Sequence, residues 1–378
     1  MIVTPIVTPI VTTIITTIVT TTAGALFGVV LGNVLFWPKV RRERIPSGAH
    51  PIAYALAILI PARNEESNIG ACLDSVCAQG SAIAEILVYD DHSTDATANI
   101  VRQHAASDAR IRLLDPLPLP PGWCGKNFAC AQLASRAGAE WMLFLDADAR
   151  LREGAADAML AEARRRDLTL LSCWPGLELD SLWERVLMPM LNFAVFTLYP
   201  APLALSRPDA SLGLAHGACL LVNRAAYERV GGHASVRSEI FEDTRLAQLW
   251  RTKGERSLCL DGQEIVRVRM YSSLPELWSG FQKNFYPAFQ TPYAFAAFLA
   301  LHGVIFLSPF LVLNWGAMGI VLGIRALLAA RFRQPWWTVL THPVGQIFLI
   351  GLGISSWWAC YSGRGVQWKG RKYRAIRV

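Results

Sequence analysis

Two aspartates separated by one alanine carry the clearest chemical signal in this sequence. Asp146 and Asp148 follow the apolar run 142–145, which has the length of a buried strand. Carboxylates at positions i and i+2 beyond a strand can share one face, where hard oxygen ligands suit Mg²⁺ or Mn²⁺ and leave positions open for phosphate oxygens. The triplet therefore predicts a divalent metal held against a diphosphate. For so short a motif taken alone, a solvated loop is the alternative.

Two more apolar runs upstream also stop in polar residues. Residues 57–60 lead through Pro61 to Arg63, and residues 85–89 lead to Asp90. Each run is followed by a segment of helical character, 67–78 after the first and 96–106 after the second. Alternating strands and helices predict a parallel sheet with right-handed crossovers, whose ligands bind beyond the carboxyl ends of the strands. The polar side chains expected at that edge are Arg63, Glu65, Asp90, Asp91, Asp146 and Asp148.

A glycine-rich loop brings one lysine toward the same region. Residues 122–127 read Gly-Trp-Cys-Gly-Lys-Asn, after a proline-rich loop and before an alanine-rich segment. Glycines let the backbone approach a ligand closely, and Lys126 offers a point charge for phosphate. The spacing of a P-loop is absent, and a solvated lysine is the alternative.

Two adjacent acids precede a short amphipathic segment. Glu242 and Asp243 come directly before residues 246–250. One carboxylate at a helix start commonly caps the helix, as we expect for Asp95 before residue 96. A second carboxylate beside it could be the general base that takes a proton from an attacking hydroxyl.

The amino-terminal region predicts a membrane anchor. The 378-residue chain is 17% charged, its mean hydropathy is +0.31, and residues 10–36 carry no charge. The basic cluster at 39–44 places the chain beyond it in the cytoplasm by the positive-inside rule. We expect an uncleaved anchor over 1–37 and a basic linker over 38–54. Because 2–9 are a repeat in a β-branched tract, a misassigned start codon is possible and the span could begin nearer Thr22.

The last third of the chain is again apolar. Candidate membrane segments cover 294–313, 316–330 and 339–360 within a membrane region at 291–361, before a basic tail at 362–378. Three full spans would put that tail outside, so one segment is expected to be re-entrant or interfacial. The stretch 186–205 is expected to lie on the bilayer surface or to pass as a hairpin, because a single crossing would separate Asp148 from Asp243. A buried core helix is the alternative for that stretch.

Cysteines and charge exclude other classes of protein. The eight cysteines form no C-x-x-C pair, which argues against a zinc site or a disulfide framework and fits reduced thiols. The net charge is +7, the basic residues cluster at the edges of the apolar segments, and no nucleic-acid motif accompanies them. The expected partner of this charge is an anionic lipid bilayer and not nucleic acid.

Five ordered motifs carry a family resemblance. Residues 61–66, 90–95, 125–126, 146–148 and 242–243 closely resemble the family 2 inverting glycosyltransferases over about residues 55–290. The resemblance implies an α/β catalytic domain of GT-A fold, with a Rossmann-like mixed sheet. Residues 122–129, 269–271, 280–284 and 368–373 are similar to the membrane-anchored branch that acts on terpenoid lipids. That branch includes the carotenoid glycosyltransferases and the hopene-associated glycosyltransferases.

The resemblance also implies roles for single residues. It implies a UDP-sugar site at Pro61, Arg63, Glu65, Asp91, Lys126 and Asp146, a Mg²⁺ or Mn²⁺ ligand at Asp148, catalytic residues at Asp243 (the base) and Glu242, and an acceptor side at Arg269, Tyr271 and Lys283. Processive members of the family carry Q-x-x-R-W near the membrane, where this chain reads Gln-Lys-Asn-Phe-Tyr at 282–286. This departure argues for a single transfer.

These features together predict a multi-pass enzyme of the cell membrane with a cytoplasmic catalytic domain. It would move one sugar, glucose by expectation, from a UDP-sugar to a hydroxyl or carboxyl of a hydrophobic terpenoid, a carotenoid first of all. A hopanoid, a diacylglycerol or a polyprenyl phosphate is the alternative acceptor. A non-catalytic membrane scaffold is the alternative from another class, although the presence of both Asp148 and Asp243 argues against it.

Overall fold

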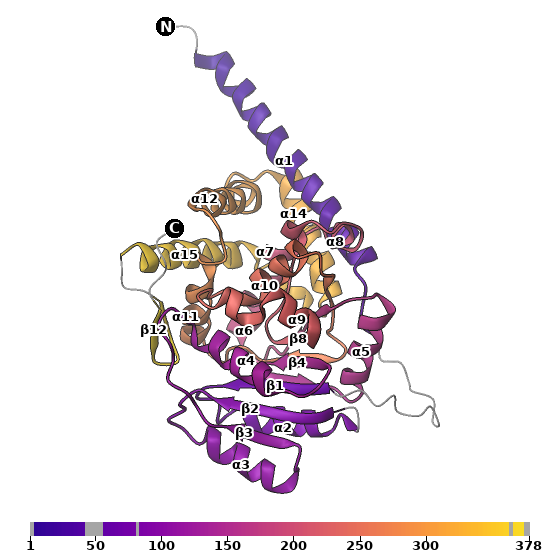
Figure 1. Ribbon diagram of the computed structural model, residues 1–378. Coiled ribbons are helices and arrows are strands. Elements are labelled where there is room, and N and C mark those ends of the chain that lie inside the picture. The colour runs from indigo at the N-terminus through magenta and orange to yellow at the C-terminus, as the bar shows by residue number, and fades with distance from the viewer. Residues whose placement is uncertain (1–3, 42–55, 81–82, 363–365, 374–378) are drawn as a thin grey trace. The chain divides into compact units, whose positions relative to one another are not determined.

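The computed structural model describes residues 4–41, 56–80, 83–362 and 366–373 (Figure 1). The chain divides into two compact units. The sheet unit comprises Pro38–Glu178 and Leu203–Met270, and the helical unit comprises Met1–Trp37, Leu179–Pro202 and Tyr271–Val378. The predicted division into anchor, linker, catalytic domain and carboxy-terminal segments stays a prediction. Most of the predicted basic linker and half of the basic tail lie outside the described residues.

A mixed sheet of seven strands forms the centre of the sheet unit, in the order β3-β2-β1-β4-β8-β6-β9. Its strands are β1 (Leu56–Ala62), β2 (Ile83–Asp90), β3 (Ile111–Leu114), β4 (Trp141–Leu145), β6 (Leu170–Trp174), β8 (Cys219–Asn223) and β9 (Ser257–Asp261). Strands β1 to β4 are parallel, and β8 runs antiparallel to both β4 and β6. The mixed sheet that the family resemblance implied is therefore present, and the strand and helix alternation predicted its parallel half. A small sheet pairs β5 (Ala149–Leu151), β10 (Val266–Val268) and β7 (Gly176–Leu177).

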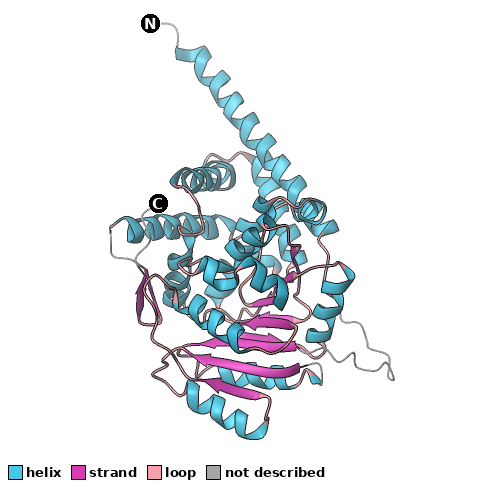
Figure 2. Cartoon of the chain, viewed as in Figure 1, coloured by secondary structure: helices cyan, strands magenta, loops and turns pink. Residues whose placement is uncertain are grey.

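Helices cover both faces of the main sheet (Figure 2). They are α2 (Ile69–Cys77), α3 (Thr97–Ser107), α4 (Gly125–Arg136), α5 (Ala155–Arg165), α9 (Arg224–Val230) and α10 (Glu242–Thr252), with single turns η2 (Ala210–Leu212) and η3 (Gly232–Val236). Leu59 of β1 and Met142 of β4 join Phe128 of α4 and Trp250 of α10 in one buried core. Because side chains alternate across a strand, a strand covered on both faces reads as a continuous apolar run, as β1 does.

This topology gathers the polar strand ends. Ala62 of β1 is in register with Asp90 of β2, and Leu59 of β1 is in register with Phe144 of β4. The chain therefore leaves β1, β2 and β4 at the same edge of the sheet, as parallel strands require. The loops that begin there hold Arg63, Asp91 and Asp146.

Three helices of the helical unit are long and apolar enough to cross a membrane, namely Val11–Phe36, Pro292–Leu311 and His342–Tyr361. The unit contains α1 (Thr4–Phe36), α6 (Leu182–Leu187), α7 (Pro189–Phe196), α11 (Leu274–Phe285), α12 (Pro292–Leu301), a π-helix (His302–Leu307), α13 (Ser308–Leu311), α14 (Trp315–Arg331), η5 (Trp336–Val339), α15 (His342–Tyr361) and the hairpin β11 (Val366–Trp368) with β12 (Arg371–Tyr373). The predicted segment 316–330 lies in the 17-residue α14, which packs against α1. Which segment is re-entrant or interfacial stays a prediction.

The stretch 186–205 is divided among α6, α7 and the short helix α8 (Ala201–Ser206). Pro189 opens α7, where its missing N–H costs no helical hydrogen bond. Phe193 and Phe196 of α7 are buried, and the Phe193 ring lies 4.8 Å from that of Phe306. The stretch forms no single continuous helix, and the buried side chains of α7 pack inside the helical unit, whereas Leu198 and Leu203 are exposed. Its contact with the bilayer surface stays a prediction.

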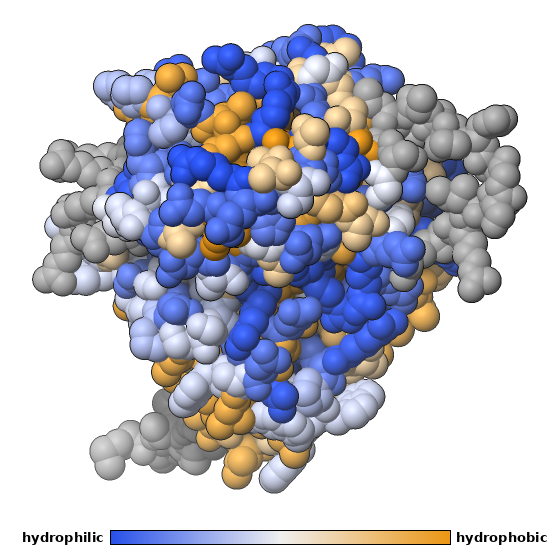
Figure 3. All heavy atoms as spheres, turned by 90° about the horizontal axis from the view of Figure 1, so that it is seen from below, coloured by the Kyte–Doolittle hydropathy of each residue, from blue (hydrophilic) through white to orange (hydrophobic). Residues whose placement is uncertain are grey.

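The two units differ in what they expose. Seen from below, hydrophilic side chains cover most of the described surface and hydrophobic ones are scattered among them (Figure 3). Large apolar side chains of the carboxy-terminal helices are exposed to more than half of their area, among them Leu311, Val312, Trp315, Leu340, Ile347 and Trp358. Exposed apolar area on this scale is typical of helices that contact lipid or another protein.

Candidate active site

The loops after β1 and β2 are joined to each other. The Arg63 guanidinium donates to the carbonyl oxygen of Asp91, and the Asp91 N–H donates to the carbonyl oxygen of Ala62 at 2.8 Å. Asn64 lies at φ +50°, where asparagine is tolerated, and its side-chain oxygen accepts from the Thr94 N–H at 2.8 Å. The structure therefore brings together Arg63 and Asp91, two residues predicted to surround the nucleotide.

Several carboxylates in these loops serve the backbone. Asp95 accepts from the N–H groups of Glu66 (3.1 Å) and Thr97 (3.0 Å), and Glu66 accepts from the Ala96 N–H at 3.0 Å. Burial alone would raise the pKa of Asp95, but the hydrogen bonds from Thr97 and Glu66 hold it below its ordinary value. Asp95 thus lies at the start of α3, but the N-cap of this helix is Ala96, whereas the sequence had predicted Asp95. Glu65 accepts from the Asn68 amide at 3.0 Å.

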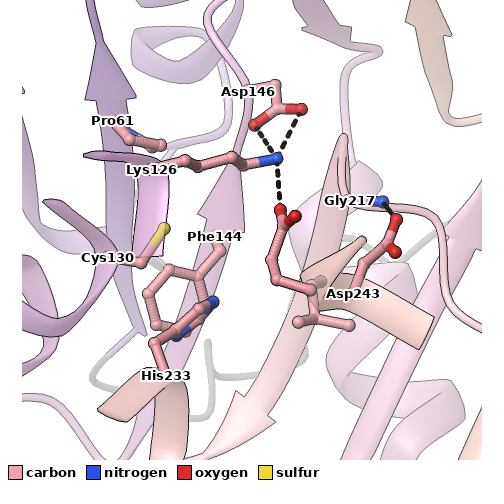
Figure 4. A pocket seen from close by; sticks show the side chains of 10 residues that line it. Pro61, Lys126, Cys130, Phe144, Asp146, Gly217, His233 and Asp243 are labelled. Atoms are coloured by element: carbon pink, nitrogen blue, oxygen red, sulfur yellow. Dashed lines mark hydrogen bonds and ion pairs between the residues drawn. The ribbon is translucent and has the colours of Figure 1, made fainter. Parts of the chain in front are cut away.

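A second group of charges lies in a pocket of the sheet unit (Figure 4). The ammonium of Lys126 lies 2.9 and 3.0 Å from the two carboxylate oxygens of Asp146 and 3.0 Å from Oε1 of Glu242. These residues come from the start of α4, the end of β4 and the start of α10. The pocket is lined by Pro61, Lys126, Cys130, Phe144, Asp146, Gly217, Leu220, His233, Glu242 and Asp243. Five of the predicted site residues therefore meet in one pocket.

Asp243 is held beside this ion-pair group by two backbone donors. The Gly217 N–H donates to Oδ2 at 2.7 Å, and the Thr244 N–H donates to Oδ1 at 2.6 Å. Burial and the adjacent Glu242 charge raise the pKa of Asp243 to about 7, although Lys126 and the two N–H donors act in the opposite direction. A carboxylate with this pKa can accept a proton near neutral pH and is suited to general base chemistry.

The neighbouring Glu242 behaves differently. Burial alone would raise its pKa, but the Lys126 ammonium lowers it and leaves the net pKa below the ordinary value. Two adjacent carboxyl groups therefore differ in proton affinity because only one of them contacts the lysine. Such a separation of pKa values is typical of catalytic carboxylate pairs.

Sequence reasoning missed the other five residues of the pocket, and two of them, Gly217 and His233, make hydrogen bonds there. Gly217 supplies the N–H that Asp243 accepts, and a Cβ built there would lie 3.0 Å from Nζ of Lys126. The signal was a glycine directly before the apolar run of β8, where close backbone approach is common. His233 bonds the Tyr227 hydroxyl through Nδ1 at 2.9 Å, and burial lowers its pKa to about 4. His233 is therefore a neutral wall of the pocket near pH 7.

Asp148 lies in the turn between β4 and β5, two residues after Asp146. In the described parts of the chain, no group of three or more His, Cys, Asp and Glu side chains could hold a metal ion. A carboxylate completed by diphosphate oxygens and water nevertheless matches the oxygen-rich shell that Mg²⁺ or Mn²⁺ takes at such sites. The donor set at Asp148 therefore fits a metal that arrives with a nucleotide diphosphate.

The residues predicted for the acceptor side fall in both units. Arg269 belongs to the sheet unit, whereas Tyr271 and Lys283 belong to the helical unit. The Tyr271 ring is buried against Gly280 of α11, where a Cβ would lie 2.3 Å from the ring. Their shared role at the acceptor stays a prediction.

A family model matches part of the sheet-forming region. Residues 57–231 match the family model "Glycosyl transferase family 2". This match covers β1 to β8 and with them Arg63, Lys126 and Asp148. The family resemblance read from the sequence is thereby confirmed.

One similar protein is a relative in sequence, and another is similar in fold. The 4,4'-diaponeurosporenoate glycosyltransferase of Staphylococcus aureus (strain MRSA252) is 27% identical over 343 residues, which cover 84% of this chain and 88% of the relative. A mannosyltransferase from Pyrobaculum calidifontis, solved in complex with GDP-Man and Mn²⁺, superposes with a TM-score of 0.55 at 17% identity. That superposition covers 91% of this chain and 99% of the other. The chain therefore has the predicted α/β fold of the GT-A glycosyltransferases, with apolar helices in its amino-terminal and carboxy-terminal regions.

Proposed function

We propose that this protein is an inverting glycosyltransferase that moves one sugar from a UDP-sugar to a hydroxyl or carboxyl of a membrane terpenoid. The observation that carries the proposal is the pocket around Lys126, where Asp243, with a pKa of about 7, lies beside the group formed by Asp146 and Glu242. The similarity to a carotenoid glycosyltransferase over 84% of the chain favours a carotenoid acceptor.

Asp243 is the proposed catalytic base. It would take the proton of the acceptor O–H as the acceptor oxygen bonds to the anomeric carbon from the face opposite UDP. The bond between that carbon and the diphosphate oxygen breaks, and UDP leaves with the bonding electrons. A carboxyl acceptor in apolar surroundings keeps its proton, so the base has the same task for either acceptor.

The donor side of the site is proposed at the strand ends. Arg63, Glu65 and Asp91 would surround the uridine. Lys126 would lie near the nucleotide, Asp146 toward the ribose and donor sugar, and Pro61 would line the same nucleotide-sugar site. Asp148 would hold Mg²⁺ or Mn²⁺, which when bound supplies charge stabilisation for the diphosphate leaving group. Holding donor and acceptor in line contributes to the rate independently of this charge stabilisation.

The acceptor is proposed to reach the enzyme from the bilayer. Three helices long and apolar enough to span a membrane support a multi-pass location. The catalytic domain is proposed to lie on the cytoplasmic face, because nucleotide sugars are available in the cytoplasm. The proposed acceptor side comprises Arg269, Tyr271 and Lys283. The departure from Q-x-x-R-W at 282–286 supports a single transfer and not chain elongation.

The test is a transfer assay on membranes that contain the full chain. Radiolabelled UDP-glucose, Mg²⁺ or Mn²⁺, and either extracted carotenoids, hopanoids, diacylglycerol or polyprenyl phosphates are supplied, and labelled lipids are identified by mass spectrometry. A glycosylated carotenoid is the expected product. Label on another lipid would keep the chemistry and replace the acceptor. No label with any UDP-sugar, together with no binding of UDP, would overturn the enzyme assignment in favour of a scaffold.

A further inference from the structure

We propose that Lys126 is a positioning residue that couples the donor side of the pocket to the proposed base, by holding Asp146 and Glu242 together through one ammonium. This inference rests on the proposed function and gives Lys126 a task different from neutralising phosphate. The contacts that carry it lie entirely within the sheet unit.

The position of Lys126 in its own helix gives no local reason for a cation. Lys126 is the second residue of α4, and no acidic residue occupies the first turn of that helix. A positive charge there faces the positive end of the helix dipole, which is unfavourable. Its partners instead come from other elements, Asp146 after β4 and Glu242 at the start of α10. The positive charge at this position is therefore explained by its partners in the pocket and not by the helix.

The one ammonium of Lys126 pairs with both carboxylates. The ammonium contacts both oxygens of Asp146 at 2.9 and 3.0 Å, and Glu242, which is only 11% exposed, at 3.0 Å. To neutralise a diphosphate, Lys126 would have to leave these contacts, and the side chains of Asp146 and Glu242, 28% and 11% exposed, would lose their counter-charge. For the nearly buried Glu242 this loss is costly.

Gly217 brings Lys126 and Asp243 to the same point. A Cβ at position 217 would lie 3.0 Å from Nζ of Lys126 and 3.2 Å from Oδ2 of Asp243. The backbone N–H of the same glycine holds that Oδ2 at 2.7 Å. Lys126 and Asp243 therefore both lie close to Gly217, so a displacement of Lys126 is expected to disturb Asp243.

Charge provides the second link between Lys126 and the base. The groups that act on Asp243 are Glu242 of its own helix, which raises its pKa, and Lys126 of α4, which lowers it. The titratable groups nearby are Cys259 of β9, whose pKa is raised by burial, and His216 beside Gly217, whose pKa burial lowers to about 3. Both are neutral near pH 7. Loss of Lys126 would leave the Glu242 charge uncompensated beside the base.

The experiment compares four variants of the full chain in membranes. Lys126→Met removes the ammonium, Lys126→Arg keeps a cation, Gly217→Ala crowds the lysine, and Lys253→Met removes an exposed lysine after α10 as the matched control. Each is measured for kcat, for KM of the UDP-sugar, for binding of UDP with Mn²⁺, and for the pH dependence of transfer.

We expect Lys126→Met to lower kcat about 100-fold, with UDP binding within about threefold of wild type, and to move the acidic limb of the pH profile to higher pH. Lys126→Arg should restore part of kcat, Gly217→Ala should lower kcat, and Lys253→Met should behave as wild type. A Lys126→Met variant with kcat and pH profile unchanged but UDP binding weakened about tenfold or more would overturn the inference and make the lysine a phosphate ligand.

A measurement without turnover separates this inference from the proposed function. Because Asp243 binds its proton more tightly in the folded protein than in the unfolded chain, its contribution to stability falls as pH rises toward about 7 and is level above it. Lys126→Met should extend that fall of the melting temperature above pH 7. A wild-type chain that transfers no sugar would overturn the proposed function alone, while an unchanged melting profile would overturn the coupling.

Discussion

The carboxylates of the loops after β1 and β2 and those of the Lys126 pocket are the same chemical groups in two different situations. Asp95 and Glu66 each accept a hydrogen bond from a backbone N–H of the facing loop, and Asp95 accepts a second one from Thr97. Asp146 and Glu242 instead share one ammonium, beside an Asp243 whose pKa is raised to about 7. The backbone donors at Asp95 hold the pKa of that carboxyl below its ordinary value, and Asp95 and Glu66 join the two loops. Asp243 also accepts from two backbone N–H groups, but its burial and the adjacent Glu242 charge outweigh them and raise its pKa to about 7.

Among the changes to pocket residues, replacing the proposed base should lower the rate of sugar transfer most. In Asp243→Asn the acceptor proton has no carboxylate to receive it, and transfer should fall by about 10³-fold, within the usual range for a lost general base. Binding of the UDP-sugar should persist, as equilibrium binding to the same membranes would report. Turnover at the wild-type rate in this variant would remove Asp243 from the mechanism.

The proposed metal ligand should give the next largest effect. Asp148→Asn replaces an anionic oxygen ligand with a neutral one, and transfer at fixed Mn²⁺ should fall about 100-fold because less charge stabilisation reaches the diphosphate. A titration with Mn²⁺ should recover part of the activity at higher concentration. Wild-type activity without added metal and in the presence of a chelator would contradict this assignment.

The pH dependence tests the raised proton affinity directly. Protonated Asp243 cannot accept a proton, so the transfer rate in wild type should fall about tenfold per pH unit below an inflection near pH 7. The rate should be level above the inflection until another group titrates. The measurement is kcat/KM between pH 5.5 and 8.5, and a rate that stays level across this range would mean that a carboxylate with an ordinary pKa limits the reaction.

Replacing a carboxylate of the loops should change sugar transfer least. Asp95→Ala removes the acceptor for the Glu66 and Thr97 N–H groups, and should lower the free energy of unfolding by about 1 kcal/mol. Transfer should change little at a temperature where the variant is folded. Glu228→Gln, which breaks an exposed pair with Arg224 at 3.1 Å, is the matched control and should cost about 0.3 kcal/mol. A loss of transfer in Asp95→Ala as large as that in Asp243→Asn would erase the distinction between the two sets.

How much the sequence could predict differs between these two regions. Alternating apolar runs and helical segments predicted the parallel half of the sheet, because period and strand length are local properties. Asp95 was assigned to a helix start because capping depends on neighbours in the chain. The reversal of β8 could not be read from its own residues, because a buried central strand reads as an apolar run in either direction.

The pocket shows the limit of sequence reasoning at the level of single contacts. The family resemblance implied a place near the nucleotide for Lys126, which stays a prediction, and gave no sign of its contacts within the protein. In the structure its ammonium joins Asp146 and Glu242, which are distant in the chain. Gly217 was missed because its importance depends on how close Lys126 and Asp243 lie to its Cα.

The sequence by itself determined which residues are polar at strand ends, the order of the family motifs, and the apolar segments long enough for a membrane. Each of these depends on residue type and spacing along the chain. Only the tertiary structure decided that Lys126 contacts both Asp146 and Glu242 and that the pKa of Asp243 is raised to about 7. Burial and the distance between charges set both properties, and neither quantity exists until strands β4 and β8 and helices α4 and α10 are packed together.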